Sequence, residues 1–360
     1  MNSALTYRLV SKALESAGLA HGVLDLGAGA RAIVVERGGR ILGPFLADDE
    51  PSLLWLNDVL LSTERLQSFL DADDWNLGGE RVRIGPELQY AVPDRSRFWE
   101  SYAMSPEDDP GRYSMKADAQ GRAWRLDKDM ILDVYPAGGT KSLRMERRVR
   151  KAADPLRELS VFPDLVQEVR YAGYEHRITI REPVADGVVS HAWNLIQVWP
   201  GGSVWIPVLP LAQHTDYYDP VQTAVEIRTP THAGLRITGD RMFKRGYRSA
   251  HVLGRVGYLG RYGDGQAYLL VRNFYNNPSY RYLDEPFAKP GWRGDSVQVY
   301  QDDGALGGFA EIECIGEDID ATVGQSEVTD TMMLWCYAGP IVRVGEIAAH
   351  LIGWNPIESL

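Results

Sequence analysis

Short segments in which hydrophobic and polar residues alternate, separated by glycine and proline, fill the second half of the chain. The clearest are 174–182 and 188–207, and further strands are predicted at 225–229, 235–238, 255–261, 267–274, 296–300 and 332–337. Many short strands bounded by turns are typical of a sandwich or barrel, whereas alternating β-α units need a helix after each strand. Only 342–351 predicts a helix in this half. We therefore expect a mainly β fold with few short helices.

Two further strands are predicted near the start, within 32–45, where Gly38 and Gly39 permit a tight turn. The preceding residues 23–30, V-L-D-L-G-A-G-A, resemble the first motif of S-adenosylmethionine-dependent methyltransferases. That motif needs a glycine-rich turn that opens a helix, and here strand-like residues follow instead. We therefore favour a hairpin over a nucleotide-binding turn.

The length of 360 residues suits either two domains or one large β domain. We predict a single domain over 1–360, with 1–20 as a helical N-terminal extension that contains a helix at 5–18. A second short helix is predicted at 64–70. The polar, proline-rich segment 93–121 is predicted to be a surface loop or lid.

Composition limits the classes of partner. The formal net charge is −11, and the basic residues form one dense run only, at 144–151. A phosphate-binding groove needs clustered positive charge, so we expect no nucleic-acid partner. No apolar run approaches the length of a membrane-spanning helix, and the first residues lack the pattern of a secretory signal. With only two cysteines, we expect a cytoplasmic protein without a membrane partner.

Two glutamates follow a glycine-rich turn at 304–308. Glu311 and Glu313 alternate with Ala310, Ile312 and Cys314, so both carboxylates would lie on one face of a strand. Carboxylates two residues apart on a strand are about 7 Å from each other, close enough to act on the same small ligand. Such a pair is typical of a functional site or, as often, of a solvated sheet face.

Two other strand segments carry candidate residues. In 78–87, G-G-E-R-V-R-I-G-P-E, the residues Arg83 and Glu87 flank a break at the end of a strand and could form a site or a surface ion pair. In 188–207, His191 and Trp193 share one face, and a turn at 200–202 predicts that 204–208 returns as the hairpin partner.

Two charged clusters allow alternative interpretations. Close spacing of His214, Asp216 and Asp219 could suit a divalent cation, but a polar turn is favoured, and we predict no metal and no cofactor. A second cluster could bind a uronate or a sugar phosphate, or form paired surface charges. This cluster comprises Arg241, Lys244, Arg245 and Arg248.

The order of several short motifs resembles that of the galactose mutarotase-like (aldose 1-epimerase-like) superfamily, in a bacterial branch. The motifs are R-G-G-R-I-L (37–42), the segment 78–87, H-A-W-N-L-I-Q-V-W-P-G-G-S-V-W-I-P (191–207), R-I-T-G-D-R-M-F-K-R-G-Y (236–247), G-F-A-E-I-E (308–313) and L-W-C-Y-A-G (334–339). The resemblance implies an antiparallel two-sheet supersandwich with a sugar cleft on a concave sheet face.

The resemblance also implies catalytic roles. In active mutarotases a glutamate near the C-terminal end takes the anomeric hydroxyl proton, and a histidine protonates the ring oxygen. Glu311 or Glu313 stands in the region of that glutamate, and His191 stands in a segment similar to the histidine motif. Residues expected to bind the substrate are Arg83, Glu87, Trp193 and Lys244.

Three functions remain open from the sequence. The first is aldose 1-epimerase (isomerase) chemistry in carbohydrate metabolism, in which a glutamate and a histidine exchange protons with the sugar. The second is a non-catalytic carbohydrate-binding protein. The third is a glycoside hydrolase or lyase, because two carboxylates can flank a scissile bond. In each case the expected partner is a small-molecule sugar or an oligosaccharide.

Overall fold

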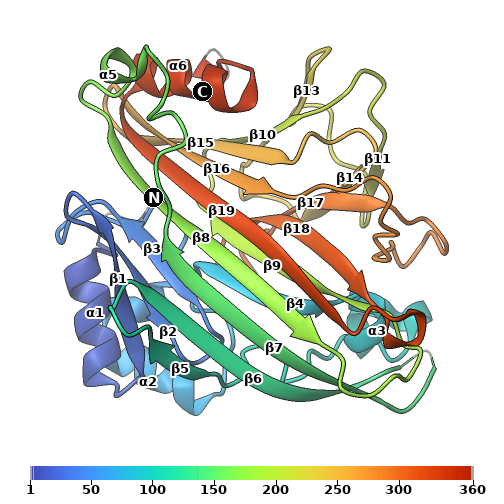
Figure 1. Ribbon diagram of the computed structural model, residues 1–360. Helices are drawn as coiled ribbons and strands as arrows, with labels where there is room; N and C mark the ends of the chain where they lie inside the picture. Colours follow the sequence, from blue (N-terminus) through green and yellow to red (C-terminus); the bar gives the residue numbers. More distant parts are fainter. Residues whose placement is uncertain (1, 3, 136, 358–360) are drawn as a thin grey trace.

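Two large antiparallel sheets make up the computed structural model, which describes residues 2, 4–135 and 137–357 (Figure 1). The first sheet has nine strands in the order β1 (His21–Gly27), β2 (Ala30–Val35), β3 (Ile41–Phe45), β4 (Glu80–Gly85), β9 (Ser190–Val198), β18 (Ala310–Ile319), β17 (Asp295–Gln301), β14 (Phe243–Arg248) and β11 (His214–Asp216). The mainly β, two-sheet fold is as expected from the sequence. Residues 1, 3, 136 and 358–360 of the predicted domain 1–360 lie outside the described part of the chain.

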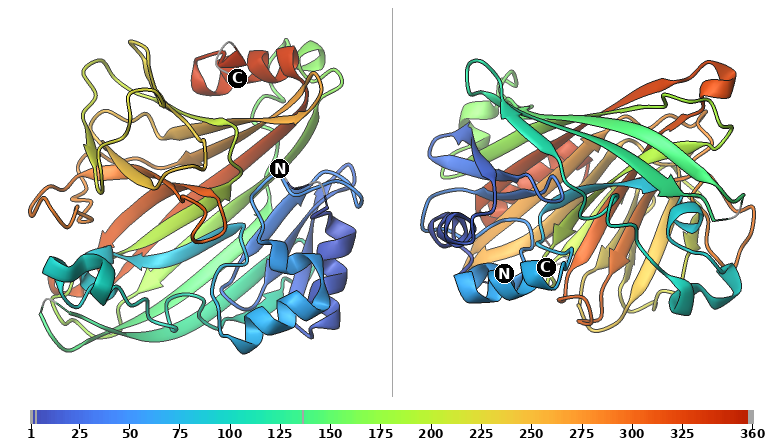
Figure 2. Two further views of the ribbon diagram at one scale, coloured as in Figure 1. Left: turned by 180° about the vertical axis from the view of Figure 1, so that it is seen from behind. Right: turned by 90° about the horizontal axis from the view of Figure 1, so that it is seen from below.

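The second sheet has ten strands. Their order is β12 (Glu226–Arg228), β13 (His232–Arg236), β10 (Ser203–Pro207), β15 (Arg255–Gly263), β16 (Gln266–Phe274), β19 (Glu327–Pro340), β8 (Arg170–Arg181), β7 (Thr140–Lys151), β6 (Ala123–Asp133) and β5 (Ser114–Ala117). Seen from behind, β1 to β3 lie with the two N-terminal helices at one end of the molecule (Figure 2).

Helices occur where the sequence predicts them. They are α1 (Tyr7–Ser16), α2 (Thr63–Asp71) and α6 (Ile341–Ile352), with single turns at α3 (Glu87–Tyr90), α4 (Phe98–Ser101) and α5 (Phe162–Leu165) and three 3₁₀ turns at η1 (Asp58–Leu61), η2 (Arg95–Arg97) and η3 (Ala321–Val323). The side chains of Thr6 and Ser62 cap α1 and α2 by accepting backbone N–H bonds. In the described part of the chain, every helix is too short or too polar to cross a bilayer.

The space between the sheets is the main core. Ile312 and Cys314 of β18 point into it and belong to one buried cluster with Leu334 and Cys336 of β19. Both cysteines are free thiols. Because side chains alternate along a strand, the neighbours Glu311 and Glu313 must point to the other side of the nine-stranded sheet.

A second buried cluster lies on the outer face of the ten-stranded sheet. Helix α6 covers this face, where Val344 and Ile347 pack with Leu269 and Val271 of β16. The α6 end of the molecule is visible at the top of Figure 1.

One topological prediction is wrong. Strand β10 does not return as the hairpin partner of β9, because the chain crosses at 199–202 to the other sheet, where β10 pairs with β13 and β15. A Pro-Gly-Gly turn predicts a reversal of direction, but the tertiary context decides which sheet receives the next strand.

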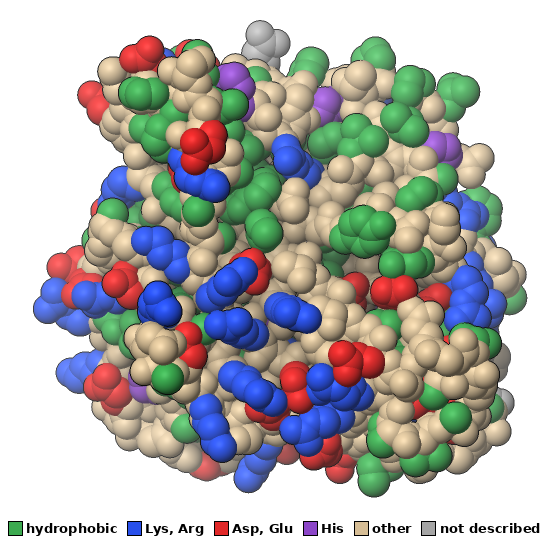
Figure 3. All heavy atoms as spheres, viewed as in Figure 1, with side chains coloured by type: hydrophobic (Ala, Val, Ile, Leu, Met, Phe, Trp, Pro, Cys, Tyr) green, Lys and Arg blue, Asp and Glu red, His purple; other side chains and the backbone are tan. Residues whose placement is uncertain are grey.

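The basic run 144–151 is part of β7 in the interior of the ten-stranded sheet rather than at its edge. Its outward side chains are paired, as in the contact of 2.7 Å between Arg150 and Glu175 and that of 3.5 Å between Arg144 and Glu146. Figure 3 shows Lys and Arg mixed with Asp and Glu over this region. Several of the positive charges on this face are thus paired with carboxylates.

Candidate functional site

A cavity of about 350 Å³ lies on the face of the nine-stranded sheet that points away from the ten-stranded sheet. The residues that line it are three cations, three carboxylates and a group of mostly aromatic side chains: Arg81, Arg83, Lys244, Glu87, Glu311, Glu313, Trp75, Trp99, Tyr102, Met104, Trp193, Tyr218, Tyr300, Leu306 and Phe309. Its volume is at the lower end of the range for small-molecule sites.

Strands β4, β9 and β18 form the floor of the cavity. Glu313 lies opposite Leu195 of β9, and Leu195 lies opposite Arg81 of β4. Because the pleat repeats every two residues, Arg81 and Arg83 face the cavity together with Trp193 and the two glutamates. The same alternation that the sequence showed around Glu311 thus places charged residues on one face across three strands.

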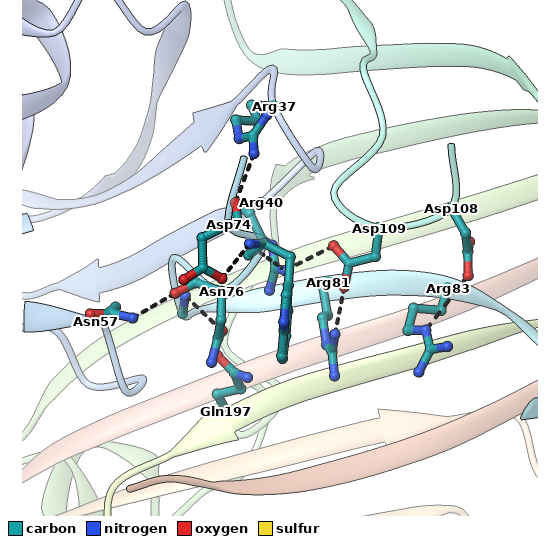
Figure 4. Close-up of polar contacts among 12 residues, drawn as sticks. Arg37, Arg40, Asn57, Asp74, Asn76, Arg81, Arg83, Asp108, Asp109 and Gln197 are labelled. Atoms are coloured by element: carbon teal, nitrogen blue, oxygen red, sulfur yellow. Dashed lines mark hydrogen bonds and ion pairs between the residues drawn. The ribbon is translucent and has the colours of Figure 1, made fainter. Parts of the chain in front are cut away.

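Arg81 joins two carboxylates at one side of the floor. Its guanidinium lies 2.5 Å from Oδ2 of Asp109 and 3.0 Å from Oε1 of Glu311, which also accepts a bond of 3.0 Å from the amide of Gln197. Figure 4 shows Arg81 and Arg83 projecting from β4 toward Asp109 and Asp108 of the following loop. Both oxygens of Glu311 are thus held by protein donors.

Arg83 and Glu87 meet beside the hydroxyl of Tyr102. The Tyr102 hydroxyl donates to Glu87 at 3.0 Å and accepts from Arg83 at 3.0 Å, and the arginine and glutamate are themselves 3.4 Å apart. Burial opposes the ionisation of Glu87, but Lys244 and Arg83 outweigh it and lower its pKa. The pair is buried rather than a surface ion pair.

Glu313 has one engaged oxygen and one free oxygen. Its Oε2 accepts the indole N–H of Trp193 at 3.0 Å and lies 3.2 Å from Nζ of Lys244. Within the described residues, no hydrogen bond to Oε1 is found. Since Glu313 lines the cavity, Oε1 is available to a ligand.

The ionisation of Glu313 differs from that of its neighbours. Burial raises its pKa to about 7, an effect that Lys244 opposes and that the negative charges of Glu311 and Glu87 increase. A carboxyl with this pKa can both take and give a proton near neutral pH. Burial lowers the pKa of Lys244, but Glu313 and Glu87 raise it well above its ordinary value, so Lys244 is a cation here.

Aromatic rings form the walls. Nζ of Lys244 lies 4.3 Å and the Arg83 guanidinium 4.9 Å from the centre of the Trp193 ring, and Arg81 lies 4.4 Å from that of Trp75. Trp99, which also lines the cavity, packs at 4.8 Å against Tyr218 and is 53% exposed. Exposed indole surface beside charged hydrogen-bonding groups suits a ligand with both apolar faces and hydroxyls.

The structure brings together all the sequence-predicted site residues except His191. Arg83, Glu87, Trp193, Lys244, Glu311 and Glu313 line one cavity, although they come from four strands and one helical turn. Their roles in binding or catalysis remain predictions.

His191 lies outside the cavity lining. Its ring sits directly on Gly85, where a Cβ would come within 2.2 Å of Nε2, and its Nδ1 is 3.7 Å from Asp318. Tyr282 packs in one buried cluster with the nearby Trp193. His191 is fully buried, and its role as the acid stays a prediction.

Several lining residues were missed by the sequence analysis. Arg81 alternates with Arg83, and this alternation could have identified it. The predicted loop or lid 93–121 supplies Trp99, Tyr102 and Met104, and its aromatic content is the signal that could have pointed to the site.

The residues of the two other charged clusters contact different partners in the structure. Both oxygens of Asp216 accept bonds from Arg245, at 2.6 and 3.0 Å, and no group of three or more potential metal ligands occurs in residues 2, 4–135 and 137–357. The four cations of the predicted patch separate, because Lys244 faces the cavity, Arg245 pairs with Asp216, and Arg248 covers Trp292.

The fold and site therefore define a two-sheet antiparallel β protein with an outer-face cavity lined by aromatic, acidic and basic residues. No protein-family model matches the sequence, and no curated protein matches it in a sequence search.

Several solved structures are similar to this chain at a low level. They include a galactose 1-epimerase from Lactobacillus acidophilus (TM-score 0.45, 9% identity, 89% of this chain and 95% of that one) and a protein assigned as an aldose 1-epimerase from Klebsiella pneumoniae (0.43, 6%, 91% and 82%). A TPR-domain containing protein from Parabacteroides distasonis also matches (0.43, 10%, 86% of this chain), and the chain spans only 45% of its length.

Proposed function

We propose that the cavity binds an uncharged sugar and that Glu313 exchanges a proton with it, which is the chemistry of an aldose 1-epimerase. The observation that carries the proposal is the carboxyl of Glu313, which has a pKa of about 7 and a free Oε1 that faces an aromatic-walled cavity. A general acid or base is most effective when its pKa lies near the working pH.

The charge balance favours an uncharged ligand. Arg81 already contacts Asp109 and Glu311, and Lys244 already lies 3.5 Å from Glu87 and 3.2 Å from Glu313. A uronate or phosphate would compete with these carboxylates rather than find a free cation. A neutral pyranose instead offers hydroxyls to the charged groups and C–H faces to the indoles.

Glu313 and Lys244 can act as one proton-transfer unit. Glu313 takes the proton of the anomeric hydroxyl, the bond between C1 and the ring oxygen breaks, and the ring oxygen takes a proton from Lys244. Protonation of Glu313 removes the negative charge that raises the pKa of Lys244 most, so the ammonium becomes a stronger acid at that moment. Glu313 is then protonated and Lys244 neutral, 3.2 Å apart, and this is the state that the reverse transfers need.

Closing the ring restores the sugar. Rotation about the C1–C2 bond presents the other face of the carbonyl, and reversal of the same two proton transfers forms the opposite anomer. All atoms and electrons are conserved, because each proton that leaves the sugar at one oxygen is matched by one gained at the other.

NMR measurement of anomer equilibration tests the proposal. With a panel of freshly dissolved aldoses, the wild type should accelerate equilibration of at least one, and Glu313→Gln should lower that rate by about 100-fold or more. Glu317→Gln is the matched control, because Glu317 lies on the same strand, contacts Gln325, and does not line the cavity. An equal rate in wild type and Glu313→Gln would contradict the catalytic role.

A second function, sugar binding without turnover, is favoured by the position of His191 outside the cavity. Saturation-transfer NMR with the same aldoses distinguishes the two. Binding without acceleration would support the binding protein, and neither binding nor acceleration would contradict a sugar ligand.

A further inference from the structure

A second cavity of about 300 Å³ adjoins the first. Its lining comprises Asp73, Trp75, Tyr102, Met104, Pro106, Asp109 and Pro110. Trp75, Tyr102 and Met104 line both cavities, so the two spaces share a wall. Each cavity alone is at the small end of the range for ligand sites, and together they are about twice that size.

The shared wall is a fixed feature. The Arg81 guanidinium lies 4.4 Å from the centre of the Trp75 ring and 2.5 Å from Asp109, which Arg40 holds from the other side at 2.9 Å. The Trp75 ring is thus held in place by buried charged groups while it borders both cavities. A held aromatic ring can bind a sugar face without a large loss of side-chain entropy.

The second cavity resembles the first in its chemistry but holds no catalytic group. Tyr102, Met104, Pro106 and Pro110 give it apolar surface, and no lysine or arginine is part of its described lining. Both oxygens of Asp109 are engaged by arginines and can still accept a hydroxyl. This wall suits an uncharged sugar ring and disfavours a uronate or sugar phosphate.

We propose that the protein binds two adjoining sugar units, one against Glu313 and the next beside Trp75 in the second cavity. The ligand is then an uncharged disaccharide or longer oligosaccharide whose reducing-end unit lies at Glu313. The inference rests on the proposed function, because it assumes that the first cavity binds a sugar.

A second sugar-binding position predicts how affinity depends on the number of units in the oligosaccharide. Each disaccharide that binds should bind about tenfold more tightly than its own reducing-end monosaccharide, the worth of one further aromatic contact. A third unit should add little, since the two cavities are then filled. Titration calorimetry with glucose, cellobiose and cellotriose measures this dependence. Maltose and β-1,4-galactobiose are each compared with their own monosaccharide in the same way.

A blocking variant locates the second unit. Pro106→Trp places a large side chain in an exposed part of the second cavity and should remove the gain from the second unit while monosaccharide affinity is unchanged. Pro183→Trp is the matched control, because Pro183 is exposed and lines neither cavity.

The outcomes separate the two proposals. Disaccharides that bind no more tightly than their monosaccharides would overturn the second subsite and leave the sugar-binding cavity intact. A gain that persists in Pro106→Trp, with monosaccharide affinity intact, would also overturn it. Failure of every monosaccharide and oligosaccharide to bind would overturn the proposed function itself.

Discussion

Two charged clusters lie on opposite faces of β4 and start from adjacent residues. Glu80 points between the sheets and contacts Arg272 at 2.7 Å, His176 at 2.6 Å and Asn194 at 2.6 Å. Arg81 points the other way, into the outer cavity. The inner cluster is enclosed by hydrophobic core, whereas the outer one borders space that a ligand can fill.

The pKa shifts of the carboxyl groups in the two clusters have opposite directions. Burial opposes ionisation of Glu80, but Arg272 and His176 outweigh it and lower its pKa. In the outer cluster, burial and like charges prevail and raise the pKa of Glu313 to about 7. A structural carboxylate is therefore fully engaged and ionised, while a carboxyl suited to proton transfer keeps a free oxygen and titrates near neutral pH.

The largest expected loss of stability follows from disrupting the inner cluster. Glu80→Gln leaves Arg272 buried without a carboxylate and should lower the free energy of unfolding by about 3–5 kcal/mol. Glu311→Gln should cost only about 1–2 kcal/mol, because Arg81 keeps Asp109 and borders the cavity. Urea denaturation measures both, with the exposed Glu327→Gln as control. Equal losses in the two variants would contradict the distinction between the clusters.

The contributions of Glu313 and Glu80 to stability should change with pH in opposite directions. The folded-state pKa of Glu313 is raised from 4.5 to about 7, so its stabilising contribution is present below pH 4.5 and is lost as the pH rises through 7. Relative to Glu313→Gln, the wild type should lose up to roughly 3 kcal/mol between pH 4 and 8. Glu80 has a lowered pKa, so its contribution is present above pH 4.5 and is lost in acid.

Denaturation at each pH checks these signs. A wild-type stability that runs parallel to that of Glu313→Gln from pH 4 to 8 would show that Glu313 titrates normally.

A smaller change should follow from removing Lys244. Because Lys244 lowers the pKa of Glu313, Lys244→Met should raise that pKa above 7 by about one unit. Carboxyl ¹³C NMR of labelled glutamate measures the shift, and Lys289→Met, in an exposed position, serves as control. An unchanged titration would mean that the 3.2 Å contact has little electrostatic effect.

The smallest expected change in stability is that of Trp99→Ala. Trp99 is 53% exposed but packs against Phe98 and Tyr218, so its loss should lower the free energy of unfolding by about 1 kcal/mol. Sugar affinity should nevertheless fall about tenfold, because the indole is part of the cavity wall. Calorimetry on this variant and on Trp124→Phe, distant from the cavity, distinguishes a binding role from a structural one.

Local alternation was sufficient to predict the orientation of the key side chains. The period of two placed Glu311 and Glu313 on one face and Ile312 and Cys314 on the other, and the structure has this arrangement. The mainly β fold followed from the number of short strands and turns, whereas the two-sheet arrangement was implied by the resemblance to the mutarotase-like superfamily.

Long-range contacts were not predictable from local pattern. One carboxylate partner of Arg81, Asp109, lies 28 residues away in a segment that the sequence predicts to be a polar surface loop. Alternation places His191 on the same face as Trp193. The packing of Tyr282 beside Trp193, however, depends on a segment that is distant in the sequence. The same limit explains why the transfer of β10 to the other sheet was missed.

A structure of the protein bound to its tightest-binding sugar from the panel tests the central claim most directly. We expect a hydroxyl of the sugar within hydrogen-bonding distance of Oε1 of Glu313, with a pyranose ring between the indoles of Trp193 and Trp99. A sugar bound elsewhere on the surface, with water alone beside Glu313, would contradict the account.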